Sequence, residues 1–123
     1  MGIGDPVASF QRGILRLDQR KDEIFRKNCT GYGCVEIKYY DIKKTDSLIM
    51  PIVGIIEVKS FEFPTTANAV IHEFLLSYHN ARWAVEKYTT RVWSTETGDG
   101  DQHFGWKYKT DAEKSVEECF NAE

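Results

Sequence analysis

Residues 34–63 decide the fold, and their sequence is CVEIKYYDIKKTDSLIMPIVGIIEVKSFEF. Apolar and polar side chains alternate over residues 34–42, and a period of two predicts a β-strand. Residues 43–47 are polar and predict a turn. The apolar run over residues 48–63 predicts a second strand, so the two form a β-hairpin. Gly54 within the second strand indicates a bulge or the close approach of another backbone.

An amphipathic helix is predicted before this hairpin, over residues 5–27. Its apolar side chains recur every three or four residues along one side, which is typical of a helix that packs against another surface. That surface is either the protein's own sheet or a second copy of the chain. Because two further helices are expected on the same sheet face, some apolar surface should be left over, and the sequence predicts a homo-oligomer through helix positions Phe10, Ile14 and Leu17.

The rest of the chain repeats one order of elements. Apolar side chains at helical spacing follow Pro64 and predict a helix that ends near residue 80. Residues 82–94 and 103–109 alternate as two strands, and the capping-box motif that begins at Thr110 opens a last helix.

The predicted fold class is therefore α+β, as a single domain over residues 1–123. An N-terminal helix is followed by two ββα units, over residues 33–80 and 82–122. The four strands form one antiparallel sheet, with the helices packed on one face.

Composition and charge exclude several classes of protein. The 123 residues are 41% hydrophobic and 28% charged, which excludes a disordered or low-complexity chain. No apolar run approaches the length of a membrane-spanning helix, so no membrane association is expected. The net charge is −3, and residues 96–123 hold three Lys and Arg against eight Asp and Glu, which disfavours nucleic acid as a partner.

The chain has three cysteines, an odd number that predicts reduced thiols and a cytoplasmic location. Cys29 and Cys34 are spaced more widely than in common zinc sites. A metal site built from them and one of His72, His79 or His103 is the less favoured alternative to isolated thiols, and the sequence predicts neither a metal nor a cofactor.

Chemistry-bearing side chains are densest in the second predicted hairpin. Guanidinium groups beside aromatic faces bind flat anions, and Trp, Tyr and Arg also concentrate binding energy in protein interfaces. The same aromatic residues are typical of a core beneath helices. We interpret the chain as a small non-catalytic binding module that engages a protein partner or a nucleotide-like anionic ligand through Arg82, Trp83, Lys87, Arg91, Trp93, His103 and Trp106.

The alternative function is a metal-dependent nuclease. Glu57 and Lys59 end an apolar strand in a Glu-x-Lys pattern, in which a carboxylate binds a divalent cation and an ammonium stabilises charge. The preceding strand carries no acidic residue at the position where such a site needs one. The favoured interpretation is a cross-strand charge ladder in which Glu36 opposes Lys59 and Lys38 opposes Glu57.

Overall fold

The computed structural model describes residues 5–26, 32–63, 68–94, 100–103 and 110–122, with side chains left undescribed at several strand ends. In that part of the chain, five antiparallel strands lie in the sheet in the order of the sequence. They are β1 (Tyr32–Lys44), β2 (Ile52–Phe63), β3 (Asn68–His79), β4 (Arg82–Ser94) and the short β5 (Gly100–His103).

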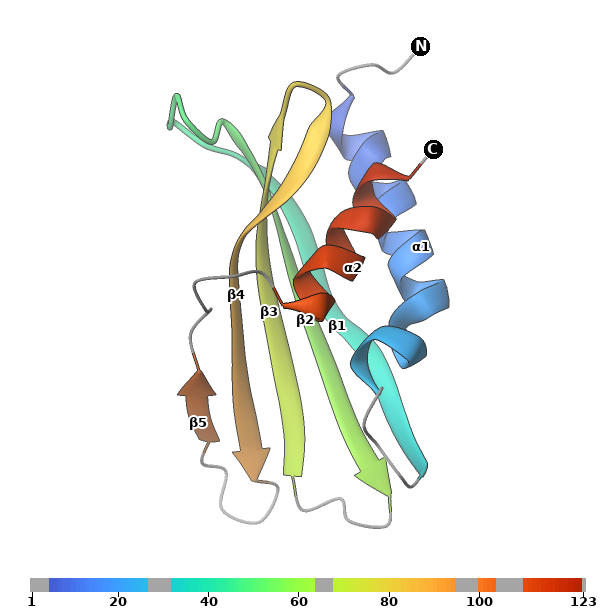
Figure 1. Cartoon of the computed structure of the whole chain (residues 1–123). Helices are drawn as coiled ribbons and strands as arrows, with labels where there is room; N and C mark the ends of the chain where they lie inside the picture. The colour runs from blue at the N-terminus through green and yellow to red at the C-terminus, as the bar shows by residue number, and fades with distance from the viewer. Residues whose placement is uncertain (1–4, 27–31, 64–67, 95–99, 104–109, 123) are drawn as a thin grey trace.

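Two helices, α1 (Pro6–Phe25) and α2 (Asp111–Asn121), lie side by side over one face of this sheet (Figure 1). Asp5 caps α1 and Pro6 begins it, and α2 opens with the predicted capping box between Thr110 and Glu113. The α+β class and the antiparallel sheet are confirmed, but the sheet has five described strands where four were predicted.

The predicted helix after Pro64 is wrong, because residues 68–79 form strand β3. Phe74 packs towards the helices, in the core, whereas Ile71 and Leu75 lie on the opposite face of the strand. Apolar side chains on both faces of a central strand produce the intervals of three and four that also characterise a helix. The chain is therefore not a pair of ββα units. Of the predicted strand over residues 103–109, only His103 lies within the described residues, in β5.

Gly54 permits the close approach of a side chain, because a Cβ at this position would collide with the ring of Phe10. The expectation of a bulge at Gly54, or of another backbone close to it, is therefore wrong. The register shift between β1 and β2 lies elsewhere, at Lys38, which has no partner residue on β2. An extra residue on one strand bends that strand and re-aims the side chains that follow it.

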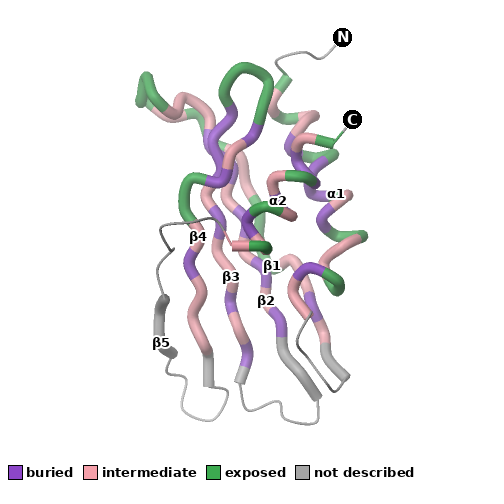
Figure 2. Tube along the Cα trace, viewed as in Figure 1, coloured by how far each residue is buried: buried purple, intermediate pink, exposed green. Residues whose placement is uncertain are grey.

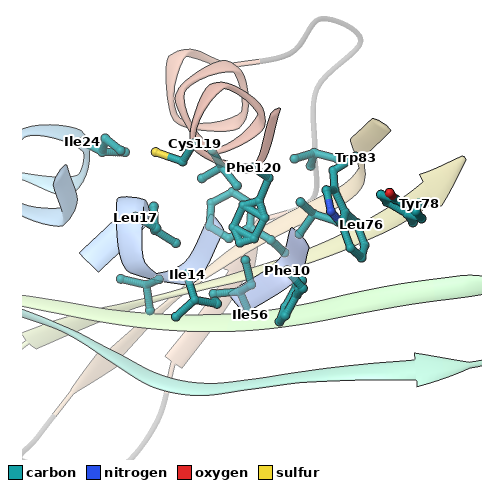
Figure 3. Close-up of a cluster of buried hydrophobic side chains, with 14 of the residues drawn as sticks. Phe10, Ile14, Leu17, Ile24, Ile56, Leu76, Tyr78, Trp83, Cys119 and Phe120 are labelled. Carbon is teal, nitrogen blue, oxygen red and sulfur yellow. The ribbon is translucent and has the colours of Figure 1, made fainter. Parts of the chain in front are cut away.

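The apolar seam of α1 lies in the core of its own chain (Figure 3). Phe10 packs against the rings of Trp83 and Phe120, with ring centroids 5.3 and 5.2 Å apart. Ile14 and Leu17 belong to the same buried cluster. The predicted contact of these α1 side chains with a second copy is therefore wrong, since the protein's own sheet and α2 already cover them.

Polar contacts hold α2 against β4 where β5 does not reach. The side-chain amide of Asn121 donates to the carbonyl oxygen of Trp83 and accepts from its N–H, both at 2.8 Å. Glu117 accepts from the N–H of Val85 at 2.7 Å. These side chains take the place of a neighbouring strand, because backbone groups at a sheet edge otherwise need water or another chain as partner.

Gly13→Ala tests how tightly the two helices approach each other. Helix propensity alone predicts a gain of about 1 kcal/mol. However, a Cβ at Gly13 would lie 2.5 Å from the ring of Phe120, so this ring, which is 2% exposed, would have to shift. We expect a loss of about 1–3 kcal/mol, the usual cost of overpacking. Urea unfolding followed by circular dichroism measures it, and a stabilised variant would contradict this packing.

Candidate functional site

The described residues of the predicted Arg and aromatic site do not all lie together in the structure. Trp83 is buried in the core with 1% of its surface exposed, and its Nε1 donates to the hydroxyl of Ser9 at 3.0 Å. A side chain enclosed in this way cannot stack on a ligand. Arg82, its neighbour, is exposed at the start of β4, beside a tight turn in which Asn80 and Ala81 have positive φ.

Lys87 and Arg91 of β4 lie on the face of the sheet opposite the helices. The guanidinium of Arg91 is 3.3 Å from the carboxylate of Glu73 on β3. The backbone of Trp93 and that of His103 lie in β4 and β5, while their side chains are not described. Trp106 lies outside the described residues. Of the predicted residues whose side chains are described, only Lys87 and Arg91 therefore lie together on one surface.

We call the surface opposite the helices the outer face. The strand registers align its side chains in four rows that run across β1, β2, β3 and β4. The rows are Glu36, Lys59, Ile71 and Arg91; Tyr39, Glu57, Glu73 and Thr89; Asp41, Ile55, Leu75 and Lys87; and Lys43, Val53, Ser77 and Ala84. Among the described elements, both helices cover the other face, so no helix lies over these rows (Figure 1).

The outer face combines apolar positions with charges of both signs. Ile55 and Leu75 are half-buried at its centre and help to line a shallow hollow of about 220 Å³. Glu73, Lys87 and Thr89 line the same hollow. Large side chains that are only half covered, ringed by charged groups, are typical of surfaces that contact another molecule.

The strand register contains one of the two cross-strand pairs that the predicted charge ladder requires and lacks the other. Glu36 does oppose Lys59, as the predicted ladder requires. The bulge at Lys38 shifts the next pair, so Glu57 opposes Tyr39 and the predicted pairing of Lys38 with Glu57 is wrong. The ammonium of Lys38 instead lies 3.6 Å from the carboxylate of Glu36 on the same strand.

A second carboxylate lies beside Glu57, because Glu73 is its partner residue on β3. Two like charges in directly opposed positions repel, and the ion pair between Arg91 and Glu73 offsets part of that repulsion. In the described part of the chain, no three His, Cys, Asp or Glu side chains gather as metal ligands. The described cysteines, Cys34 and Cys119, are both free thiols.

A partly buried chain of polar side chains on the inner face was missed by the sequence analysis. His72 Nε2 lies 3.2 Å from the hydroxyl of Ser60, and His72 Nδ1 lies 2.8 Å from that of Tyr88. Phe25 packs on the imidazole and Phe74 on the Tyr88 ring. The predicted helix had placed His72 on a helix face, which removed it from its partners on the neighbouring strands.

The surroundings of this polar chain favour a structural role. Burial lowers the pKa of His72 from its ordinary 6.5 to about 4, so the imidazole is neutral at pH 7. Burial, and to a lesser extent the charge of Glu113, raises the pKa of Tyr88 well above its usual range, so the phenol is neutral too. A serine hydrolase needs a carboxylate to stabilise the charged imidazole, whereas here a neutral phenol occupies that position.

A scan against protein-family models found no match for this chain, and neither did searches of curated proteins and of solved structures. The class that the fold defines is an α+β protein with one antiparallel sheet and a single layer of helices. No described helix is long and apolar enough to cross a membrane.

Proposed function

We propose that this protein is a non-catalytic binding module whose outer face binds a protein partner. The observation that carries the proposal is the set of half-buried apolar side chains, Ile55 and Leu75, that no described helix covers. Lys87 and Arg91 beside them supply donors for carboxylate or carbonyl groups of the partner. Arginines near the centre of a patch are among the residues that carry most of the binding energy in protein interfaces.

A protein fits this face better than a nucleotide-like anion. Glu57 and Glu73 lie side by side at its centre and would repel a phosphate. The hollow is shallow and lined by both signs of charge, whereas small-ligand sites are concave and enclose most of the ligand. Trp83, one of the predicted stacking residues, is buried. Binding of an anion through Trp93, His103 and Trp106 remains the second form of the proposal.

Arg91→Ala and Leu75→Glu test the outer face. Wild-type protein and each variant serve as immobilised bait for a cell lysate, and the captured protein is then purified and its affinity measured by calorimetry. We expect Arg91→Ala to weaken binding by about 1–3 kcal/mol, as loss of a charge-assisted bond does. The melting temperature should hardly change, because exposed ion pairs contribute about 0–1 kcal/mol to stability.

Arg12→Ala is the matched control, since Arg12 is exposed on α1, on the opposite side of the sheet. Equal capture by the wild type, by Arg91→Ala and by Leu75→Glu would contradict the proposed surface.

The second candidate function is the metal-dependent nuclease, and the juxtaposition of Glu57 with Glu73 favours it. Two carboxylates on neighbouring strands can share a divalent cation, and Lys59 would stabilise charge on the substrate. Plasmid DNA and RNA incubated with the protein and Mg²⁺ or Mn²⁺ test this activity. If the wild type cleaves either nucleic acid and Glu57→Gln does not, the protein is a nuclease and the proposed binding function is wrong.

A further inference from the structure

The turn between β1 and β2 presents two large apolar side chains to solvent. Leu48 is 97% exposed and Ile49 is 83% exposed. Both lie in the loop that projects from one end of the sheet, where Figure 2 shows a continuous exposed stretch. Single exposed apolar residues are common on protein surfaces, but two adjacent ones with nearly complete exposure at a loop tip are unusual.

Hydrogen bonds hold this tip in one conformation. The Thr45 hydroxyl donates to the carbonyl oxygen of Met50 at 2.5 Å and accepts from the N–H of Ser47 at 3.1 Å. The Ser47 hydroxyl accepts from the N–H groups of Ile49 and Met50 at 3.1 and 3.2 Å. A preorganised loop loses little conformational entropy when it binds, which favours contact of the apolar tip with another molecule.

A hollow of about 600 Å³ lies directly beside the tip, between the loop and the end of the β3–β4 hairpin. Leu48, Ile49 and Met50 of the tip form one side of this hollow, and the β3–β4 hairpin lines the other. Arg82 and Glu86, both exposed, line it with opposite charges. The same patch of surface therefore carries an apolar projection, a hollow that this projection helps to line, and one charge of each sign.

We propose that this protein forms a twofold symmetric homodimer in which Leu48 and Ile49 of each copy enter the hollow of the other. A twofold axis requires one patch that is complementary to itself, so that residue i contacts residue j and j contacts i. A tip that projects and also lines the hollow allows this arrangement, because the tip of each copy can then pack against the tip and the β3–β4 hairpin of the other. The same axis brings Arg82 of one copy to Glu86 of the other, twice in each dimer. The inference does not depend on the partner proposed for the outer face.

The charges around the tip favour a second copy over a lipid surface. Lys43 and Lys44 approach the tip from β1, but Asp46 lies in the loop itself and Glu86 lines the hollow. Loops that insert into anionic membranes carry an excess of Lys and Arg, whereas this surface carries both signs.

Sedimentation velocity under reducing conditions, at about 1–100 µM protein, tests the dimer. We expect the wild type to associate reversibly, and Leu48→Glu and Ile49→Glu each to raise the dissociation constant by about tenfold or more, because each places a charge where an apolar group was buried. Leu15→Glu is the matched control, since Leu15 is 65% exposed on α1 and away from the tip. It should associate as the wild type does.

A charge-reversal pair tests whether Arg82 and Glu86 meet across the contact between two copies. Arg82→Glu and Glu86→Arg should each weaken self-association, because each variant opposes like charges in both contacts of its own dimer. An equimolar mixture of the two should associate more strongly than either alone, since both contacts of the mixed dimer are then between opposite charges. A mixture that shows no recovery would mean that Arg82 and Glu86 do not meet across the contact between copies.

Three results would overturn the proposal. The first is a wild type that stays monomeric across the concentration range. A monomer that co-sediments with vesicles of phosphatidylserine and phosphatidylcholine would equally overturn the dimer. The second is a dimer that Leu48→Glu and Ile49→Glu leave unchanged. The third is a mixture of the charge-reversal variants that associates no better than each variant alone. Melting curves of every variant separate loss of association from loss of folding.

Discussion

Leu17→Glu should abolish cooperative folding, whereas Leu15→Glu, two residues away on the same helix, should leave the protein folded. Leu17 has 0% of its surface exposed, and Leu15 has 65%. Removing a buried leucine costs about 2–5 kcal/mol. Burying a carboxylate without a partner costs several kcal/mol more. The sum reaches the whole stability of a typical domain, about 5–15 kcal/mol.

Thermal unfolding followed by far- and near-ultraviolet circular dichroism measures this difference. Phe10→Glu, at another buried position of the same seam, should behave as Leu17→Glu does. If the seam bound a second copy instead, Leu17→Glu would give a folded monomer with a normal melting transition. That result would contradict the intramolecular packing of α1 on the sheet.

Acidification should destabilise the protein through His72. Burial lowers the pKa of this imidazole from 6.5 to about 4, so the unfolded chain takes up a proton that the folded protein does not. The free energy of unfolding is therefore unaffected by His72 above about pH 7 and falls as the pH decreases from about 6.5 to about 4. A shift of this size corresponds to a loss of about 3 kcal/mol.

Urea unfolding at a series of pH values tests the titration of His72. His72→Gln should have a lower stability at pH 7, because Ser60 and Tyr88 lose a partner. Its stability should also fall less steeply than that of the wild type between pH 6.5 and pH 4. His79→Gln is the control, since His79 is exposed at the end of β3. An unchanged slope in His72→Gln would show that this imidazole titrates normally.

The local elements could be predicted wherever their signal lies in neighbouring residues. Asp5 and Pro6 begin α1, and the capping box at Thr110 begins α2, because side chains within three residues satisfy the free N–H groups of a helix start. The alternation in β1 and the apolar run in β2 predicted their hairpin. These features need no knowledge of the rest of the chain.

Strand β3 could not be assigned by the same means. Ile71, Phe74, Leu75 and Tyr78 have the spacing of one helix face. A strand with apolar side chains on both faces gives the same spacing, and the neighbouring residues do not distinguish the two. Pairing with β2 on one side and β4 on the other decides the matter, since a central strand satisfies its backbone through two neighbours. Because β3 was predicted as a helix, the contacts of His72 with Ser60 and Tyr88 could not be predicted from the sequence.

The sequence by itself determined that this protein has one antiparallel hairpin, a capped helix near each end of the described chain and a surface with charges of both signs. Only the tertiary structure decided which side chains remain accessible. Trp83 and Leu17 were predicted to contact a partner, as Arg91 was, but Trp83 and Leu17 are buried and Arg91 is partly exposed. Leu48, predicted within the apolar run of a strand, is 97% exposed. Burial depends on what packs over a residue, and here the covering side chains come from distant elements, as Phe120 of α2 does over Phe10 of α1.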